Sequence, residues 1–247
     1  GAVAEYTDKF MVKQYSLLNT AAKQKELLNI YQRKPDKQII SELVGADAVA
    51  YMSTNMLDIN NWFQLLLKDE NIRKSDVDFM KKKFKNNFGI ELDDFFKAIT
   101  NHFGIAIYNY TFPANPFDAI NIIVSTDSKT KINTFMQNAF KSLKTMSNLN
   151  LKTEKRDGLE ITTLSGSLII LPFDISYTFK DNMLIIGSSA SITKIIGFQK
   201  NKQNIINSPE YADFFNRNKT VNTSAIISFA KIINMIKQHK IFLENAF

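Results

Sequence analysis

The sequence predicts an α+β fold, in which helices pack on a mostly antiparallel, extended sheet built from recurring strand–helix units. Apolar residues switch repeatedly between a helical period of about 3.6 and a strand period of two. Hairpin turns connect consecutive strands, which makes much of the sheet antiparallel. The order strand, cap, helix recurs over residues 46–67, 119–143, 183–198 and 223–240. Because no exact sequence period accompanies this order, we expect two related α+β units around one sheet and no solenoid.

Residues 1–36 are predicted to form an N-terminal unit whose main element is a helix over Ala4–Gln32. Apolar residues in this stretch follow one helical stripe, and Pro35 would end the helix because it lacks a backbone donor. This helix could also be the connection from a preceding segment. No low-complexity linker divides the rest of the chain, so residues 37–247 are expected to form a single α+β domain.

The first part of this domain is predicted to be mainly helical. Gly89 would end one helix, because glycine accepts a positive φ at no steric cost. Asp93 and Asp94 fit the first turn of the next helix, where carboxylates favour the positive end of the dipole. The predicted elements are a helix over residues 37–45, a strand over 46–54, helices from Asp58 and over 76–87, and a helix with an apolar stripe of Leu92, Phe95, Phe96 and Ile99.

An antiparallel hairpin is predicted to follow from Gly104. Pro113 and Pro116 would close its first strand, because proline has no donor for the ladder. Ala119–Val124 is a nearly continuous apolar run, which indicates a strand buried on both faces. In the first strand, Ile105, Ile107, Asn109 and Thr111 would point to one side and Ala106, Tyr108, Tyr110 and Phe112 to the other.

The second part of the domain is predicted to alternate strands and helices. Asp127 or Ser128 would cap a long helix through Leu143. Asp157-Gly158 is a strong signal for a type I′ hairpin turn. The remaining predicted elements are strands over 149–155, 159–164, 168–171, 175–179 and 183–187, a helix opened by Ser188–Ser191, a helix begun by Ser208-Pro209, a strand over 224–229 and a helix over 230–243.

The net charge of +7 does not by itself indicate a nucleic-acid partner. Only four of the 31 basic residues are arginines, and arginine is the better bidentate reader of phosphates and base edges. The densest basic run, from Lys81 to Lys85, has helical spacing and is typical of a solvated helix face. A weak attraction to anionic surfaces is the alternative. We therefore expect no specific nucleic-acid partner.

The chain has no cysteine, which excludes disulfides, thiolate catalysis and cysteine-based metal sites. His102 and His239 lie far apart and have no partner at metal-ligand spacing. A first-turn position explains Asp93 and Asp94 better than a catalytic carboxylate pair does, since adjacent helical residues point about 100° apart. Gly187-Ser188-Ser189 fits a helix cap better than an anion site. We assign no catalytic residue, no metal ligand and no cofactor.

Four aromatic residues are the candidates for contact with a ligand. Tyr108, Tyr110 and Phe112 share one face of a predicted strand and could stack on a sugar or a base. Trp62, on a predicted helix, could do the same. Ordinary packing in the core is the alternative interpretation of all four side chains.

Several segments together resemble a family of exported bacterial proteins with a domain of unknown function, many of them predicted lipoproteins. The resemblance covers roughly residues 40–240, although phenylalanine and lysine replace small residues and leucine at many positions. It implies export and an α+β fold, and it implies no activity. The segments are ADAVAYMST, FGIELDDFFKAITNHFGIAIY, RDGLEITTL, YTFKDNMLIIGSSASITKII, SPEYADFF and SAIISFAKII.

We therefore expect a non-enzymatic, exported domain of the cell envelope with a binding or structural role, periplasmic or on the cell surface. Its partner would be an envelope component or another envelope protein. Gly1 before Ala2 is typical of tag removal, so we expect a lost N-terminal signal or anchor, which would provide any membrane association. No segment approaches the roughly 20 apolar residues of a membrane span.

Two alternatives stay open. A carrier of an apolar ligand is suggested by the 20 phenylalanines and 8 methionines. A hydrolase of envelope material would require a polar cleft that gathers His102 with two or more carboxylates.

Overall fold

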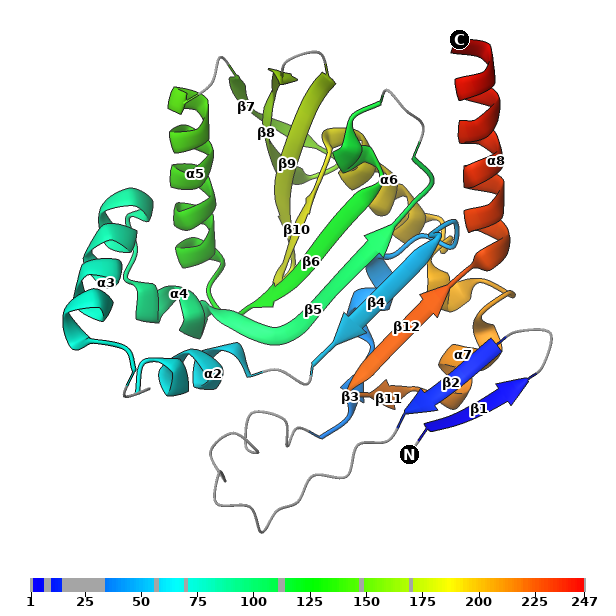
Figure 1. Cartoon of the computed structure of the whole chain (residues 1–247), viewed down its shortest axis with the longest axis horizontal. Coiled ribbons are helices and arrows are strands. Elements are labelled where there is room, and N and C mark those ends of the chain that lie inside the picture. The colour runs from blue at the N-terminus through cyan, green and yellow to red at the C-terminus, as the bar shows by residue number, and fades with distance from the viewer. Residues whose placement is uncertain are drawn as a thin grey trace.

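The computed structural model describes residues 2–6, 10–14, 34–55, 58–68, 71–110, 114–146, 149–168 and 171–246 (Figure 1). An eight-stranded sheet of order β12-β4-β5-β6-β10-β9-β8-β7 runs through the molecule, and each neighbouring pair is antiparallel. Helices pack against it. The predicted α+β class, with a mostly antiparallel extended sheet, is confirmed.

The first part of the domain follows the predicted order with one correction: the helix predicted over residues 37–45 is only a 3₁₀ helix over Ile39–Leu43, and Lys37 belongs to a short strand, β3. The Asp58 side chain caps α2 by accepting a 3.0 Å hydrogen bond from the Asn61 N–H. Gly89 ends α3 with a φ of 72°, as predicted, and Asp93 and Asp94 lie in the first turn of α4. The elements are β3 (Asp36–Lys37), the 3₁₀ helix η1 (Ile39–Leu43), β4 (Ala50–Thr54), α2 (Ile59–Leu66), α3 (Lys74–Phe88), α4 (Leu92–Ala98) and β5 (Ile99–Ile107).

The second part contains the predicted hairpins. Asp157 and Gly158 have φ values of 52° and 82°, which confirms the tight turn between β7 and β8. Ser128 Oγ accepts a hydrogen bond from the Lys131 N–H at the start of α5. The elements are η2 (Pro116–Asp118), β6 (Ile120–Thr126), α5 (Lys129–Met146), β7 (Asn150–Arg156), β8 (Leu159–Leu168), β9 (Leu171–Lys180), β10 (Met183–Gly187), α6 (Ser189–Lys200), η3 (Ile205–Asn207), α7 (Ala212–Arg217), β11 (Thr220–Val221), β12 (Thr223–Ile227) and α8 (Phe229–Ala246).

The N-terminal residues correct the prediction of a helix that starts at Ala4. Residues 2–6 and 10–14 form strands β1 (Ala2–Tyr6) and β2 (Phe10–Gln14), which pair antiparallel. Valine, tyrosine and phenylalanine in these strands favour extended backbone. The helix prediction uses only the spacing of apolar residues and does not take this β-strand preference into account. The rest of the predicted helix, up to residue 33, lies outside the described residues.

Several predicted strand boundaries are also wrong. The chain turns at Ala46 and Asp47, where the Ala48 N–H bonds the Gly45 carbonyl, so β4 begins only at Ala50. β5 begins at Ile99, before Gly104, with a register irregularity between Ile99 and Phe103, and it ends at Ile107. No separate strand over 168–171 is found in the described residues: Leu168 ends β8, Leu171 begins β9, and β9 runs through the predicted strand over 175–179.

Two further predictions need correction. β6 is not buried on both faces: Asn121, Ile123 and Ser125 are buried, whereas the intervening residues are half-buried. Pro209 does not begin a helix. The Tyr211 N–H bonds the Ser208 carbonyl in a turn, and α7 starts at Ala212.

The strand order is symmetric about the central pair β6 and β10. From β6 the chain passes through α5 and returns to the sheet at one edge, as β7. From β10 it passes through α6 and α7 and returns as β12, at the other edge. The predicted strand–helix pairs β4–α2, β6–α5, β10–α6 and β12–α8 are all present. This arrangement agrees with two related units around one sheet.

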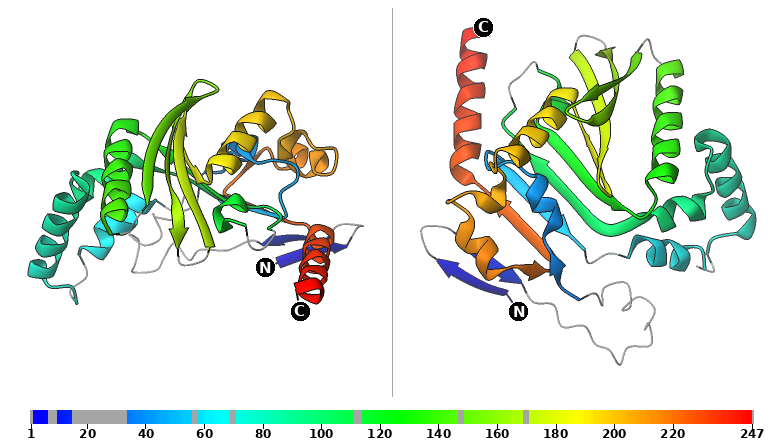
Figure 2. Two further views of the ribbon diagram at one scale, coloured as in Figure 1. Left: turned by 90° about the horizontal axis from the view of Figure 1, so that it is seen from above. Right: turned by 180° about the vertical axis from the view of Figure 1, so that it is seen from behind.

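The two sides of the sheet carry separate cores. Ile123 and Ile185, directly opposite in β6 and β10, pack with Ile192 and Ile195 of α6. Leu184, which precedes Ile185 and so points to the other face, packs with α5. Figure 2 shows α5 and α6 on opposite sides of the sheet. No described helix is long and apolar enough to cross a membrane.

Candidate functional site

The face of the sheet opposite to α6 is covered by a helix over one half only. Over β10, β9 and β8, α5 packs Ile132, Met136 and Phe140 onto it. Over β12, β4, β5 and β6, no element lies across this face within the described ranges (Figure 1). We call the side chains of these four strands on this face the open face.

Strand pairing arranges the open face in rows, because directly opposite residues of antiparallel strands share a face. The rows are mainly apolar and continue without interruption from the edge strand β12 to β6. They are Ile227–Ala50–Ile107–Ile120, Ala225–Met52–Ile105–Ile122 and Thr223–Thr54–Phe103–Val124.

Exposure separates the open face from the covered half of the same sheet face. Met52 is 42% exposed, Ile107 39% and Ile227 57%. Two of the three rows, those of Met52 and Thr54, continue into Tyr177 and Phe179 of β9, which lie under α5 and are buried. The open face therefore has the apolar composition of a core surface, but no described helix covers it.

Helix α8 follows the edge strand β12 and stands beside the open face (Figure 1). Its Phe229, Ile233 and Ile236 are spaced i, i+4, i+7 and are 63%, 51% and 58% exposed. Lys231 Nζ, from another side of the helix, donates a 2.8 Å hydrogen bond to the Ala46 carbonyl. Gln238 Oε1 accepts a 2.9 Å bond from Asn109 Nδ2. We call Phe229, Ile233 and Ile236 the α8 stripe.

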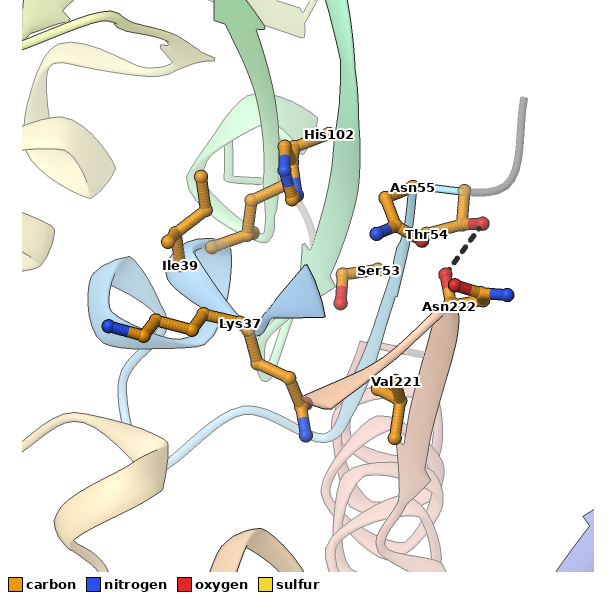
Figure 3. A pocket seen from close by; sticks show the side chains of 10 residues that line it. Lys37, Ile39, Ser53, Thr54, Asn55, His102, Val221 and Asn222 are labelled. Atoms are coloured by element: carbon orange, nitrogen blue, oxygen red, sulfur yellow. Dashed lines mark hydrogen bonds between the residues drawn. The ribbon is translucent and has the colours of Figure 1, made fainter. Parts of the chain in front are cut away.

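A small polar pocket lies between β3, η1, β4, β5 and β11 (Figure 3). Thr54 Oγ1 donates a 3.2 Å hydrogen bond to the Asn222 carbonyl at its rim. Asn55 is only 6% exposed, and its Oδ1 has no hydrogen-bond partner among the described residues. Gln38 Oε1 likewise has no hydrogen-bond partner among the described residues, although the Gln38 amide N–H donates to the Asn218 carbonyl. The free volume fits about one water molecule.

His102 lines this pocket, and its Nε2 lies 3.3 Å from Asp36 Oδ2. The structure thus brings His102 next to one carboxylate. In the described part of the chain, no group of three or more histidine, aspartate or glutamate side chains could hold a metal ion. The constellation that the hydrolase alternative requires is not present among these residues.

The predicted ligand-contacting residues lie in different places. Trp62, on α2, is exposed, and it is remote from the end of β5, where Tyr108 lies (Figure 1). Tyr108 is 5% exposed and packs in the core on the α6 side. Tyr110 is half-buried and donates a 3.0 Å hydrogen bond to the Ala114 carbonyl. Phe112 lies outside the described residues. A ligand role for these four residues stays a prediction.

Sequence reasoning missed the open face. The signal was present in Ile105 and Ile107, which were placed on one side of their strand, and in the apolar run of β6. An apolar strand face normally indicates burial, and no local pattern tells whether a helix covers it.

No protein-family model matches the chain, and no match is found among curated proteins or solved structures. The interpretation of the open face and the polar pocket therefore depends on their own geometry.

Proposed function

We propose that this chain is a non-enzymatic binding domain of the cell envelope and that the open face is its binding surface. The observation that carries the proposal is the contrast between the two halves of one sheet face. Met52 and Ile107, on the open half, are exposed, whereas Tyr177 and Phe179, on the covered half, are buried by α5.

The size of the open face supports binding. Four strands about 4.8 Å apart and rows about 7 Å apart give about 14 Å in each direction between the outer Cα atoms. With its side chains the face covers roughly 400 Å², which is in the range of apolar patches that are often functional. Burial of apolar surface contributes about 25 cal/mol per Å², so a partner that covers this face gains substantial free energy.

The open face is one side of a sheet and not an enclosed cavity, which favours a macromolecular partner over a small ligand, since small-ligand sites are concave. The phenylalanine content, which suggests a carrier, has another use in this fold. Phe84, Phe88, Phe95 and Phe135 pack against one another between α3, α4 and α5, with ring centroids 4.5 Å apart for Phe95 and Phe135. We therefore place the carrier second.

Location in the envelope is supported by the resemblance to exported bacterial proteins. Its test is cell fractionation with an antibody against this protein, in the cells that produce it naturally. Recovery with the envelope or the periplasm is expected. Recovery only with the cytoplasm would contradict export. It would not bear on binding at the open face, which the dye experiment tests separately.

Binding at the open face is tested with an environment-sensitive apolar dye, at a protein concentration at which light scattering finds only the monomer. The double variant Met52→Glu/Ile227→Glu places charges at two exposed positions of the face, so it should fold normally and lose most of the dye fluorescence. The matched control is Phe79→Glu, because Phe79 is 66% exposed and lies on α3, far from the face. Equal fluorescence of the double variant and wild type would overturn the proposal, provided both melt at the same temperature.

Native mass spectrometry of freshly purified protein separates the two candidates. A bare or multimeric protein mass is expected for a domain that binds a macromolecule. A reproducible small-molecule adduct would favour the carrier.

A further inference from the structure

We infer that the partner of the open face is the α8 stripe of a second copy of this chain, in a reciprocal exchange between two molecules. This inference rests on the proposed function, because it assigns an occupant to the same surface. The chain displays both parts of one contact: an apolar sheet face without a helix and an apolar helix stripe without a sheet.

The contact between α5 and the covered half of the sheet shows how a helix can cover this face. α5 has 18 residues and covers the same face of the sheet with Ile132, Met136 and Phe140, at i, i+4 and i+8. α8 also has 18 residues, and its stripe has nearly the same spacing. At 1.5 Å per residue, α8 is about 27 Å long, which is enough to cross four strands.

The orientation of α8 prevents it from covering the open face of its own chain in the observed arrangement. Residues two apart on a helix point about 200° apart. Lys231 and Gln238 hold one side of α8 to the body, through Ala46 and Asn109. Ile233 and Ile236, each two positions from one of these anchors, therefore point away from the body.

A two-fold exchange would bury both open faces and both stripes in one closed dimer, as an isologous interface requires. Each open face covers roughly 400 Å², and the helix that covers it buries about the same area, so the interface would total about 1,600 Å², the usual size for a stable complex. A contact in one direction only would bury half as much and leave one of each surface exposed. The reciprocal dimer is therefore the arrangement that the two surfaces favour.

The first test is the mass of the intact protein in solution, by light scattering after size-exclusion chromatography, over a hundredfold range of concentration. Wild type is expected to be a dimer at the upper end. Ile233→Glu/Ile236→Glu, in the stripe, and Met52→Glu/Ile227→Glu, in the open face, should each raise the dimer dissociation constant at least tenfold. Phe79→Glu should leave it unchanged.

The second test locates the contact between chains. The protein has no cysteine, so single cysteines can be placed without background. A mixture of Met52→Cys and Ile233→Cys molecules should form a disulfide-linked dimer on mild oxidation, in higher yield than either variant alone. Cross-linking confined to each variant with itself would overturn the assigned contact.

The outcomes distinguish the two proposals. A monomer at every concentration whose open face still binds the dye would overturn the second-copy inference and leave the binding surface in place. A monomer that binds no dye would overturn both, since the face would then be covered within its own chain. A dimer that survives both double variants would overturn this interface.

Discussion

The backbone N–H of Gly45 donates a 3.1 Å hydrogen bond to Tyr108 Oη, across 63 residues of sequence. The bond is buried, and burial raises the pKa of the Tyr108 hydroxyl far above its usual value. Gly45 itself has no room for a side chain, because a Cβ there would overlap the Phe198 ring. The Tyr108 hydroxyl thus serves the junction of η1 and β5, whatever else the side chain does.

Tyr108→Phe is expected to destabilise the fold by about 1–3 kcal/mol, because it leaves the buried Gly45 donor without its acceptor. Urea unfolding measures this loss. Tyr110→Phe is the matched control: Tyr110 is half-buried and bonds the Ala114 carbonyl, so its loss should stay below about 1 kcal/mol. Equal losses of stability in the two variants would show that the hydrogen bond between Gly45 and Tyr108 contributes no more than an ordinary tyrosine hydrogen bond.

A second prediction compares glycine-to-alanine substitutions at two sites, Gly158 in the β7–β8 turn and Gly197 in α6, which should change stability in opposite directions. Gly158 has a φ of 82°, and a Cβ added there would meet no atom within 4 Å, so Gly158→Ala should cost about 1 kcal/mol through backbone strain alone. Gly197 lies inside α6, also with open space around it, so Gly197→Ala should stabilise by up to about 1 kcal/mol. Thermal unfolding of both variants would show the two signs. The same sign at both sites would contradict the assigned backbone conformations.

Much of the fold could be predicted, because its signals are local. The Asp157-Gly158 turn, the cap at Asp58 and the glycine at the end of α3 each specify a backbone conformation within a few residues. The wrong predictions have two kinds of cause. Residues 2–6 and 10–14 are strands for a local reason, since they carry residues that favour extended backbone and pair with each other. β4 starts late for a non-local reason, because the Ala46 N–H bonds to the Gln203 carbonyl, far along the chain.

A third prediction concerns pH and Asp93, in the first turn of α4. Its carboxylate accepts hydrogen bonds from Lys81 Nζ at 2.7 Å and from Gln64 Nε2 at 3.3 Å, which join α4 to α3 and α2. The Lys81 bond is the main cause that lowers the pKa of Asp93. A lowered pKa in the folded state stabilises the fold above the unfolded pKa of about 3.9, and this gain is lost as the pH falls further.

Asp93→Asn should therefore lower stability most near pH 7, and the difference from wild type should shrink below about pH 4. The side chain is about a third exposed, so solvent screening keeps the loss below about 1 kcal/mol. Asp94→Asn is the control, since Asp94 pairs with a different lysine, Lys131 of α5, at 3.1 Å. Chemical unfolding at several pH values measures both. A wild-type advantage that does not change with pH would exclude the Asp93 charge as its source.

The candidate site was less predictable than the fold. Ile105 and Ile107 were correctly placed on one side of their strand, yet an apolar side suggests burial whether or not a helix covers it. Coverage depends on where α5 and α8 lie, and that is decided by packing between elements far apart in sequence. The polar pocket was missed for a similar reason, since Gln38 and Asn55 meet only in the folded chain.

The polar pocket yields a fourth prediction. Asn55 Oδ1 is buried without a partner among the described residues, and a buried acceptor normally bonds at least to water. A high-resolution crystal structure should show an ordered water about 2.7–3.2 Å from this oxygen. An empty pocket would contradict the expectation, and so would an ion held at about 2.4 Å by several oxygens, which would identify a cation site instead.

The last prediction concerns salt and the proposed dimer. Each copy carries a net charge of +7, so two copies repel each other while their apolar surfaces attract. Salt screens the repulsion, with a Debye length of about 30 Å at 0.01 M and about 10 Å at 0.1 M, and it leaves the apolar contact in place. The dimer should therefore bind more tightly at 0.1 M salt than at 0.01 M, as sedimentation equilibrium would measure. Dimerisation that weakens with added salt would indicate an interface made by opposite charges, which the open face and the α8 stripe do not supply.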